Sequence, residues 1–228
     1  MTCRAVITLL LVLSAGSRGQ ERGGVKATVA LPVVIGALGK AHASGSLSYW
    51  GRCDIDHQLP DFPRLHPTAK NSSSTVEALR EIFSDDPEMR VTQEPDGTIR
   101  MTETDAPRDL LDLRISHISF KAAYDDSWGV PYDPRFALAA ILKAPEVQAF
   151  MQSHDIGQQN EFALVNGGGQ VPSPNLLHIP ADLYNVTLSQ ALDYVLRTFP
   201  GIWIYENCNS VTRSRVVYFK LFEVPPRG

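Results

Sequence analysis

An ungapped internal repeat with an offset of 113 residues constrains the fold of this chain more than any other feature of its sequence. Ala78-Leu79 aligns with Ala191-Leu192, and the similarity continues through a proline into an alternating apolar segment in each copy. Each copy has the pattern of a helix, a proline-containing turn, a strand, a second turn and a second strand. The repeat therefore predicts an α+β chain that contains two small, related β-α-β-β-like modules.

Local signals place the elements of each copy. In the first copy, hydroxyl-bearing residues precede an amphipathic helical pattern, and the Pro-Asp-Gly sequence at 95–97 is a strong turn between two short strands. In the second copy, Thr187 or Ser189 caps the helix. The strands expected in the second copy lie at 176–179, 202–205 and 216–222.

These patterns divide the chain into four parts. The segment 44–70 is rich in proline, aspartate and aromatic residues, so we expect it to be an extended covering segment of the first module. Pro145 separates two short helical patterns that form a bridge between the modules. The predicted parts are a signal peptide at 1–17, a first module at 44–120, a helical bridge with a Gly/Pro linker at 121–174, and a second module at 175–228.

The N-terminus has the layout of a secretory signal peptide. One basic residue, Arg4, precedes an apolar run that is followed by small residues up to Ser17. Cleavage is expected near residue 17 or near residue 43, where Ala41-His42-Ala43 forms a second site of the A-x-A type. The alternative is an uncleaved N-terminal anchor. We therefore expect a periplasmic or secreted protein with no integral membrane segment after signal removal.

Cysteine content agrees with export. Removal of the signal peptide takes away Cys3 and leaves Cys53 and Cys208. An even number of cysteines in an exported chain predicts a disulfide, and two separate thiols are the alternative.

Composition narrows the class of partner. The chain is 43% hydrophobic and 20% charged, which is typical of a globular protein. Its formal net charge is −4, and Lys and Arg form no basic stripe. Because proteins that bind nucleic acid concentrate positive charge on one face, we expect no nucleic-acid partner.

A family resemblance appears in the second module. The sequence Leu183-x-Asn185-Val186-Thr187-Leu188-x-x-Ala191-Leu192-Asp193, followed by a strand pair, resembles the short N-terminal domain shared by secretins and TonB-dependent receptors. The resemblance covers residues 175–222 and, more weakly, 72–102. It implies a small β-α-β-β fold and a periplasmic interaction domain that contacts an envelope protein or peptide. No barrel or pore segment follows in this sequence, so we expect a binding role without receptor or channel activity.

No motif in the chain carries catalytic chemistry. A G-x-S-x-G nucleophile elbow and a P-loop are both missing from the sequence. Cys53, Asp54, His57 and His66 are ligand types for metals, but their spacing matches no metal pattern. We therefore expect no catalytic residue, no cofactor and no metal.

Two alternatives from other function classes stay open. The first is a periplasmic hydrolase or small-ligand-binding protein, in which Asp54, His57, His117 and His154 converge in a cleft between the modules. The second is a structural component of the cell envelope.

Aromatic residues distinguish the second copy from the first. Where Arg90 and Thr92 are predicted to point outward in the first copy, the second copy has Trp203 and Tyr205. We expect an aromatic partner-binding face or, alternatively, a partner strand added at a sheet edge. A further alternative is that the bridge helices or the segment around Trp50 cover this face. The candidate partner-binding residues are Trp203, Tyr205, Tyr218 and Phe222.

Overall fold

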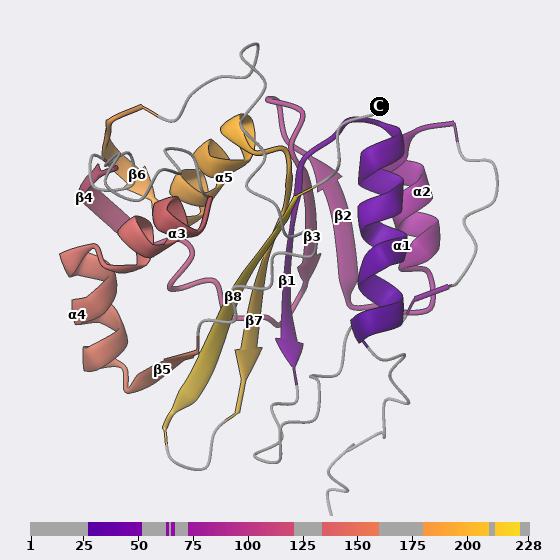
Figure 1. Ribbon diagram of the computed structural model, residues 1–228. Helices are drawn as coiled ribbons and strands as arrows, with labels where there is room; N and C mark the ends of the chain where they lie inside the picture. Colours follow the sequence, from indigo (N-terminus) through magenta and orange to yellow (C-terminus); the bar gives the residue numbers. More distant parts are fainter. Residues whose placement is uncertain are drawn as a thin grey trace, which may run out of the picture.

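The computed structural model describes residues 27–51, 63, 65–66, 73–120, 134–159, 180–209 and 213–223. Within these ranges the chain forms five helices and two sheets, so the expected α+β class is confirmed (Figure 1). The helices are α1 (Ala27–Lys40), α2 (Thr75–Ile82), α3 (Pro134–Leu142), α4 (Pro145–Ser153) and α5 (Leu188–Thr198). The strands are β1 (Gly45–Gly51), β2 (Met89–Gln93), β3 (Ile99–Glu103), β4 (Arg114–Ser119), β5 (Ile156–Gln159), β6 (Asp182–Thr187), β7 (Gly201–Cys208) and β8 (Arg215–Glu223).

One sheet contains both predicted hairpins. Its strand order is β2-β3-β1-β7-β8-β5. The hairpins β2–β3 and β7–β8 are antiparallel, whereas β1 lies between them and runs parallel to both β3 and β7. The remaining two strands, β4 and β6, form a separate antiparallel ribbon.

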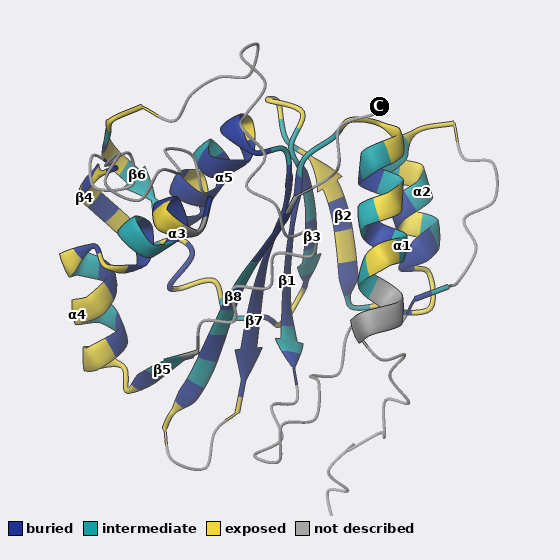
Figure 2. Cartoon of the chain, in the orientation of Figure 1, coloured by how far each residue is buried: buried dark blue, intermediate teal, exposed yellow. Residues whose placement is uncertain are grey.

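Helices cover both faces of the six-stranded sheet. On one face α1 and α2 pack against the first hairpin, β1 and part of β7; on the other, α3 and α5 lie between the sheet and the ribbon, and α4 lies next to β4 and β5 (Figure 1). Because the central strands are covered on both sides, β1 and β7 are buried almost throughout (Figure 2). Two apolar cores, one on each face of the sheet, hold the layers together.

The two helices and two hairpins predicted around 75–103 and 188–223 form where the sequence places them. Ser74 caps α2 by accepting a hydrogen bond from the backbone N–H of Glu77. Thr187 and Gln190 form a capping box at the start of α5, so Thr187 is the cap. Both α2 and α5 are followed by an antiparallel hairpin, β2–β3 and β7–β8 respectively. Pro145 starts α4, the second bridge helix, as expected.

The segment from residue 44 onward differs from the expectation. Residues 45–51 do not form a cover; they form β1, the strand that connects the two hairpins. Leu47 and Tyr49 pack into the α1–α2 core, whereas the small residues Ser46 and Ser48 are buried on the opposite face. The prolines that suggested an extended segment begin only at Pro60, after the strand has ended.

The structure does not test the first strand predicted for the second copy. The range 176–179 lies outside the described residues, and the observed strand, β6, spans Asp182–Thr187. It pairs with β4 and does not join its own hairpin.

The segment that contains the second predicted cleavage site is part of the fold. Residues 27–40 form α1, in which Val34 and Leu38 are completely buried in the core over β1 and β7. Among the described helices, none is both long and apolar enough to cross a membrane.

Candidate interaction site

The predicted aromatic face is not exposed. Trp203 is 3% exposed, Tyr205 is completely buried, Phe222 is also buried and Tyr218 is half-buried. Trp203 and Tyr205 face the α3–α5 core, whereas Phe222 packs on the opposite side with α1 and α2. The expected exposure of this face is therefore wrong, because helices cover both sides of a sheet that the two copies share.

A buried polar network fixes Trp203 in this position. Asp193 on α5 accepts hydrogen bonds from the Trp203 indole N–H at 2.9 Å and from two nitrogens of Arg100 at 3.1 and 2.5 Å. The Arg100 guanidinium also donates to the Ser46 hydroxyl at 3.2 Å. One carboxylate thus ties α5 to β7 and, through Arg100, to β3 and β1.

A second buried polar row crosses the opposite face at the carboxyl ends of the parallel strands. Tyr49 donates a hydrogen bond to the completely buried Glu206 at 3.1 Å, and the Lys220 ammonium lies 3.6 Å from the same carboxylate. Glu103, also buried, accepts a hydrogen bond from the Trp50 backbone N–H at 2.6 Å. Burial and the nearby Glu206 carboxylate raise the pKa of Tyr49 well above its usual value, so this phenol stays protonated and donates.

Gly51→Ala is expected to destabilise the protein strongly, because an added Cβ would lie 2.1 Å from Glu206 Oε1. Glu206 is enclosed and hydrogen-bonded, so its carboxylate has no free space to move into. We expect a loss of about 2 kcal/mol or more in the free energy of unfolding, measured by urea titration. Gly36→Ala is the matched control, because no atom lies within 4 Å of the added Cβ. Equal stability of the two variants would contradict the described packing.

The exposed side chains of the ribbon form the strongest candidate interaction site. We define the ribbon surface as Arg114 and His117 on β4 together with Asp182, Tyr184 and Asn185 on β6. Tyr184 is 67% exposed; the other large hydrophobic residue found exposed in the described ranges is Phe136 on α3, at 43%.

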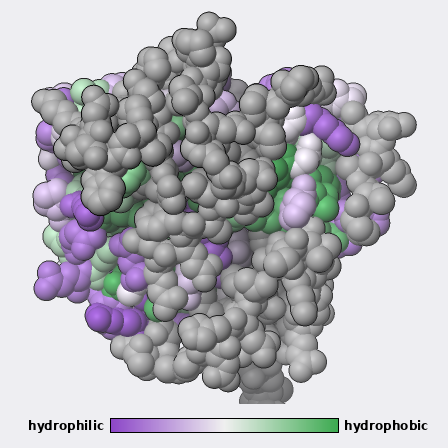
Figure 3. Space-filling model, in the orientation of Figure 1, coloured by the Kyte–Doolittle hydropathy of each residue, from purple (hydrophilic) through white to green (hydrophobic). Residues whose placement is uncertain are grey.

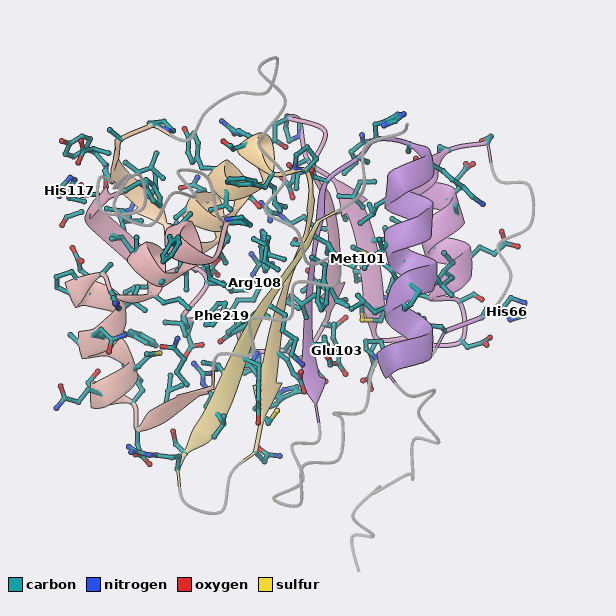
Figure 4. The ribbon with its side chains drawn as sticks, viewed as in Figure 1. His66, Met101, Glu103, Arg108, His117 and Phe219 are labelled. Carbon is teal, nitrogen blue, oxygen red and sulfur yellow. The ribbon has the colours of Figure 1, made fainter. Side chains whose placement is uncertain are left out.

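Cross-strand contacts hold the Tyr184 ring in place. His117 and Tyr184 are directly opposite each other in the ribbon, and their rings stack with centroids 4.8 Å apart. The His117 Nε2 atom lies 2.8 Å from Asp182 Oδ1, which fixes the imidazole from its other side. His117 lies at the outer side of the molecule, far from the sheet core around Phe219 (Figure 4).

Asn185 gives β6 the shape that turns Tyr184 outward. Its φ of 53° lies in the left-handed region, which asparagine tolerates better than most residues. Arg114 Nη1 donates to the Asn185 side-chain oxygen at 2.9 Å and to its carbonyl at 3.3 Å. The inward-facing residues Leu183 and Val186 are therefore three positions apart, and Tyr184 and Asn185 between them are both exposed.

At the edges of two strands, β4 and β2, side chains form hydrogen bonds with backbone groups. The Ser116 N–H of β4 donates to Glu146 Oε1 at 3.0 Å, and hydrogen bonds from Ser116 lower the pKa of this carboxyl. In β2, the Val91 carbonyl accepts from Nε and Nη2 of Arg80, both at 3.2 Å. A partner strand would have to displace these contacts, so the ribbon side chains are better placed for recognition than these edges.

Of the residues proposed for a cleft between the modules, the two that the structure describes, His117 and His154, have separate surroundings. Cys53, Asp54 and His57 lie outside the described residues. His117 belongs to the ribbon surface, whereas His154 follows α4 and stacks on Phe150 with ring centroids 4.0 Å apart. The surface around α4 and β5 is largely hydrophilic (Figure 3). Within the described ranges, no group of three or more His, Cys, Asp or Glu residues is placed to hold a metal ion.

No local sequence pattern predicts the ribbon surface. The strand β6 carries the first part of the motif that resembles a known family, but the exposure of Tyr184 depends on its pairing with β4, which lies more than sixty residues earlier in the chain. Comparison of the chain with family models, with curated proteins and with solved structures finds no match in any of the three.

Proposed function

We propose that this protein is an exported, non-catalytic interaction module of the cell envelope that binds a protein or peptide partner through the ribbon surface. The observation that carries the proposal is the largely exposed Tyr184 ring, stacked on His117 and thereby restricted before any partner binds. A large aromatic side chain with little conformational freedom to lose is a favourable anchor in an interface.

The expected compartment rests on two features of the sequence. The N-terminal residues have the layout of a signal peptide, and the motif from Leu183 to Asp193 resembles the periplasmic domain of secretins and TonB-dependent receptors. The element order β6, α5, β7, β8 is consistent with the β-α-β-β unit that this resemblance implies. The two copies of the internal repeat are proposed to be related modules that share one sheet.

A Cys53–Cys208 disulfide is part of the proposal. Cys208 is buried at the end of β7, directly opposite Gly51 at the end of β1. Cys53 follows Gly51 by two residues, so the chain length allows the two cysteines to meet. Peptide mass mapping of the exported protein without reduction is expected to recover the linked pair.

Tyr184→Ala tests the proposed site. We expect the variant to bind its partner about 30-fold more weakly, because the loss of a central aromatic anchor costs about 2 kcal/mol. A photocrosslinking residue at position 184, expressed in the native envelope, identifies the partner, and titration calorimetry with the purified partner then measures the affinity.

The matched control is Phe136→Ala, which removes an exposed aromatic ring on α3 that is not part of the ribbon surface. We expect its affinity to equal that of the wild type and a crosslinker at 136 to give no adduct with the same partner. An unchanged affinity of Tyr184→Ala, with unchanged stability, would rule out the ribbon surface as the binding site.

A further inference from the structure

A group of buried polar atoms lies on β7 and β8, away from the ribbon surface. The Tyr205 hydroxyl, both polar atoms of the Asn207 side chain and Arg215 Nε are enclosed, and in the described part of the chain none of them makes a well-formed hydrogen bond to another protein group, although Asn207 lies close enough to Tyr205 to lower its pKa. We call Tyr205, Asn207 and Arg215 the buried polar cluster. Tyr205 and Asn207 are completely buried, and Arg215 is 9% exposed.

Strand geometry brings the three side chains together. Tyr205 and Asn207 are two residues apart on β7 and therefore point to the same face of the sheet. Their partners on β8 are Phe219 and Val217, and Arg215 is the next residue on that face of β8. Along this face of β7 the side chains therefore change from largely apolar to polar toward the end of the strand.

The charge in this cluster is already balanced. Arg215 Nη2 lies 2.6 Å from Asp109 Oδ1, so an ion pair neutralises the guanidinium while its Nε–H remains directed elsewhere. An additional buried anion would leave a net negative charge, and a cation would face the guanidinium. The chemistry of the cluster therefore favours a neutral occupant.

Hydrogen-bonding capacity defines that occupant more closely. Tyr205 can donate and accept, the Asn207 amide offers two donors and one acceptor, and Arg215 offers one donor. Buried polar groups in native proteins nearly always have a hydrogen-bond partner. A buried group without a partner has lost its hydrogen bonds to water and gained none, which destabilises the folded state. A site with several such groups is what an internal water molecule requires.

We infer that the buried polar cluster is an internal hydration site, in which one or more bound water molecules bridge Tyr205, Asn207 and Arg215. Burial raises the pKa of Tyr205 above its usual value, so its hydroxyl remains a donor to this water. The inference is independent of the proposed partner binding.

Tyr205→Phe in the full chain tests the inference by thermal unfolding. If water bridges the cluster, the hydroxyl is hydrogen-bonded and its removal lowers Tm by about 2–4 °C. If the site is dry, the hydroxyl is unsatisfied and its removal leaves Tm unchanged or raises it, which would overturn the inference. Tyr184→Phe is the control, because that hydroxyl belongs to an exposed residue, and we expect no change.

A direct measurement separates water from any other occupant. In the wild-type protein, NMR magnetisation transfer from long-lived water to the Asn207 side-chain amide is expected, and it is expected to weaken in Tyr205→Phe. Absence of this transfer in the wild type would overturn the inference. Retention of an organic molecule by the purified protein in native mass spectrometry, lost in Tyr205→Phe, would also overturn it.

Discussion

A chain that begins at Ser44, the product of cleavage at the later predicted site, is expected to lose cooperative folding. It lacks α1, whose Val34 and Leu38 are completely buried against the sheet. Removing two such side chains lowers the free energy of unfolding by about 3–6 kcal/mol. The newly exposed apolar surface of Leu47 and Ile204 adds to this loss. A loss of this size is comparable with the whole stability of a typical domain, about 5–15 kcal/mol.

The matched control is a chain that begins at residue 18, the product of cleavage at the earlier site. We expect this chain to unfold in one cooperative transition, and the chain from Ser44 to aggregate or to bind a hydrophobic dye. N-terminal sequencing of the exported protein is expected to place its first residue before Ala27, where α1 begins. Equal thermal transitions of the two chains would mean that α1 is dispensable.

Asp193→Ala is expected to cost about 3–5 kcal/mol in the free energy of unfolding. The carboxylate of Asp193 is almost fully buried and holds both the Arg100 guanidinium and the Trp203 indole. Without it, the largely enclosed guanidinium loses its buried partner and keeps only the partly exposed Glu94 carboxylate, 3.6 Å from its Nε, beside an indole ring whose centroid is 5.8 Å away. Urea unfolding monitored by tryptophan fluorescence measures the loss.

Asp112→Ala is the control for this prediction, since Asp112 pairs with Arg108 at 3.3 Å and both side chains are exposed. An exposed pair contributes at most about 1 kcal/mol, so this variant is expected to be nearly as stable as the wild type. Replacing Arg100 by Met in the Asp193→Ala background is expected to recover part of the loss, because the charge that has lost its buried partner is then removed. Equal costs for Asp193→Ala and Asp112→Ala would refute the proposed role of the network.

Local interactions account for the parts of the fold that the sequence predicted. The start of α5 depends on Thr187 and Gln190, three residues apart, and the start of α4 depends on the proline at its first position. A hairpin forms between two consecutive strands, so its alternating apolar and polar residues and its turn residues all lie in one short segment of the sequence. The helix and hairpin of each copy could therefore be read from the repeat alone.

The candidate site required pairings that no local pattern contains. Tyr184 is exposed because β6 pairs with β4 and bends at Asn185, whereas Trp203 is buried because α5 covers it and Asp193 binds its indole. Alternation along a strand separates two faces of side chains, but it does not show what packs on either face.

The sequence by itself determined that a hairpin follows a helix in 75–103 and again in 188–223, since capping, helical periodicity and turns act over a few residues. Only the tertiary structure decided that β1 joins the two hairpins into one sheet and that α2 and α5 lie on opposite faces of it. Those outcomes follow from burying apolar surface between segments distant in the chain, which places the aromatic residues of β7 inside the protein and leaves the ribbon to present Tyr184.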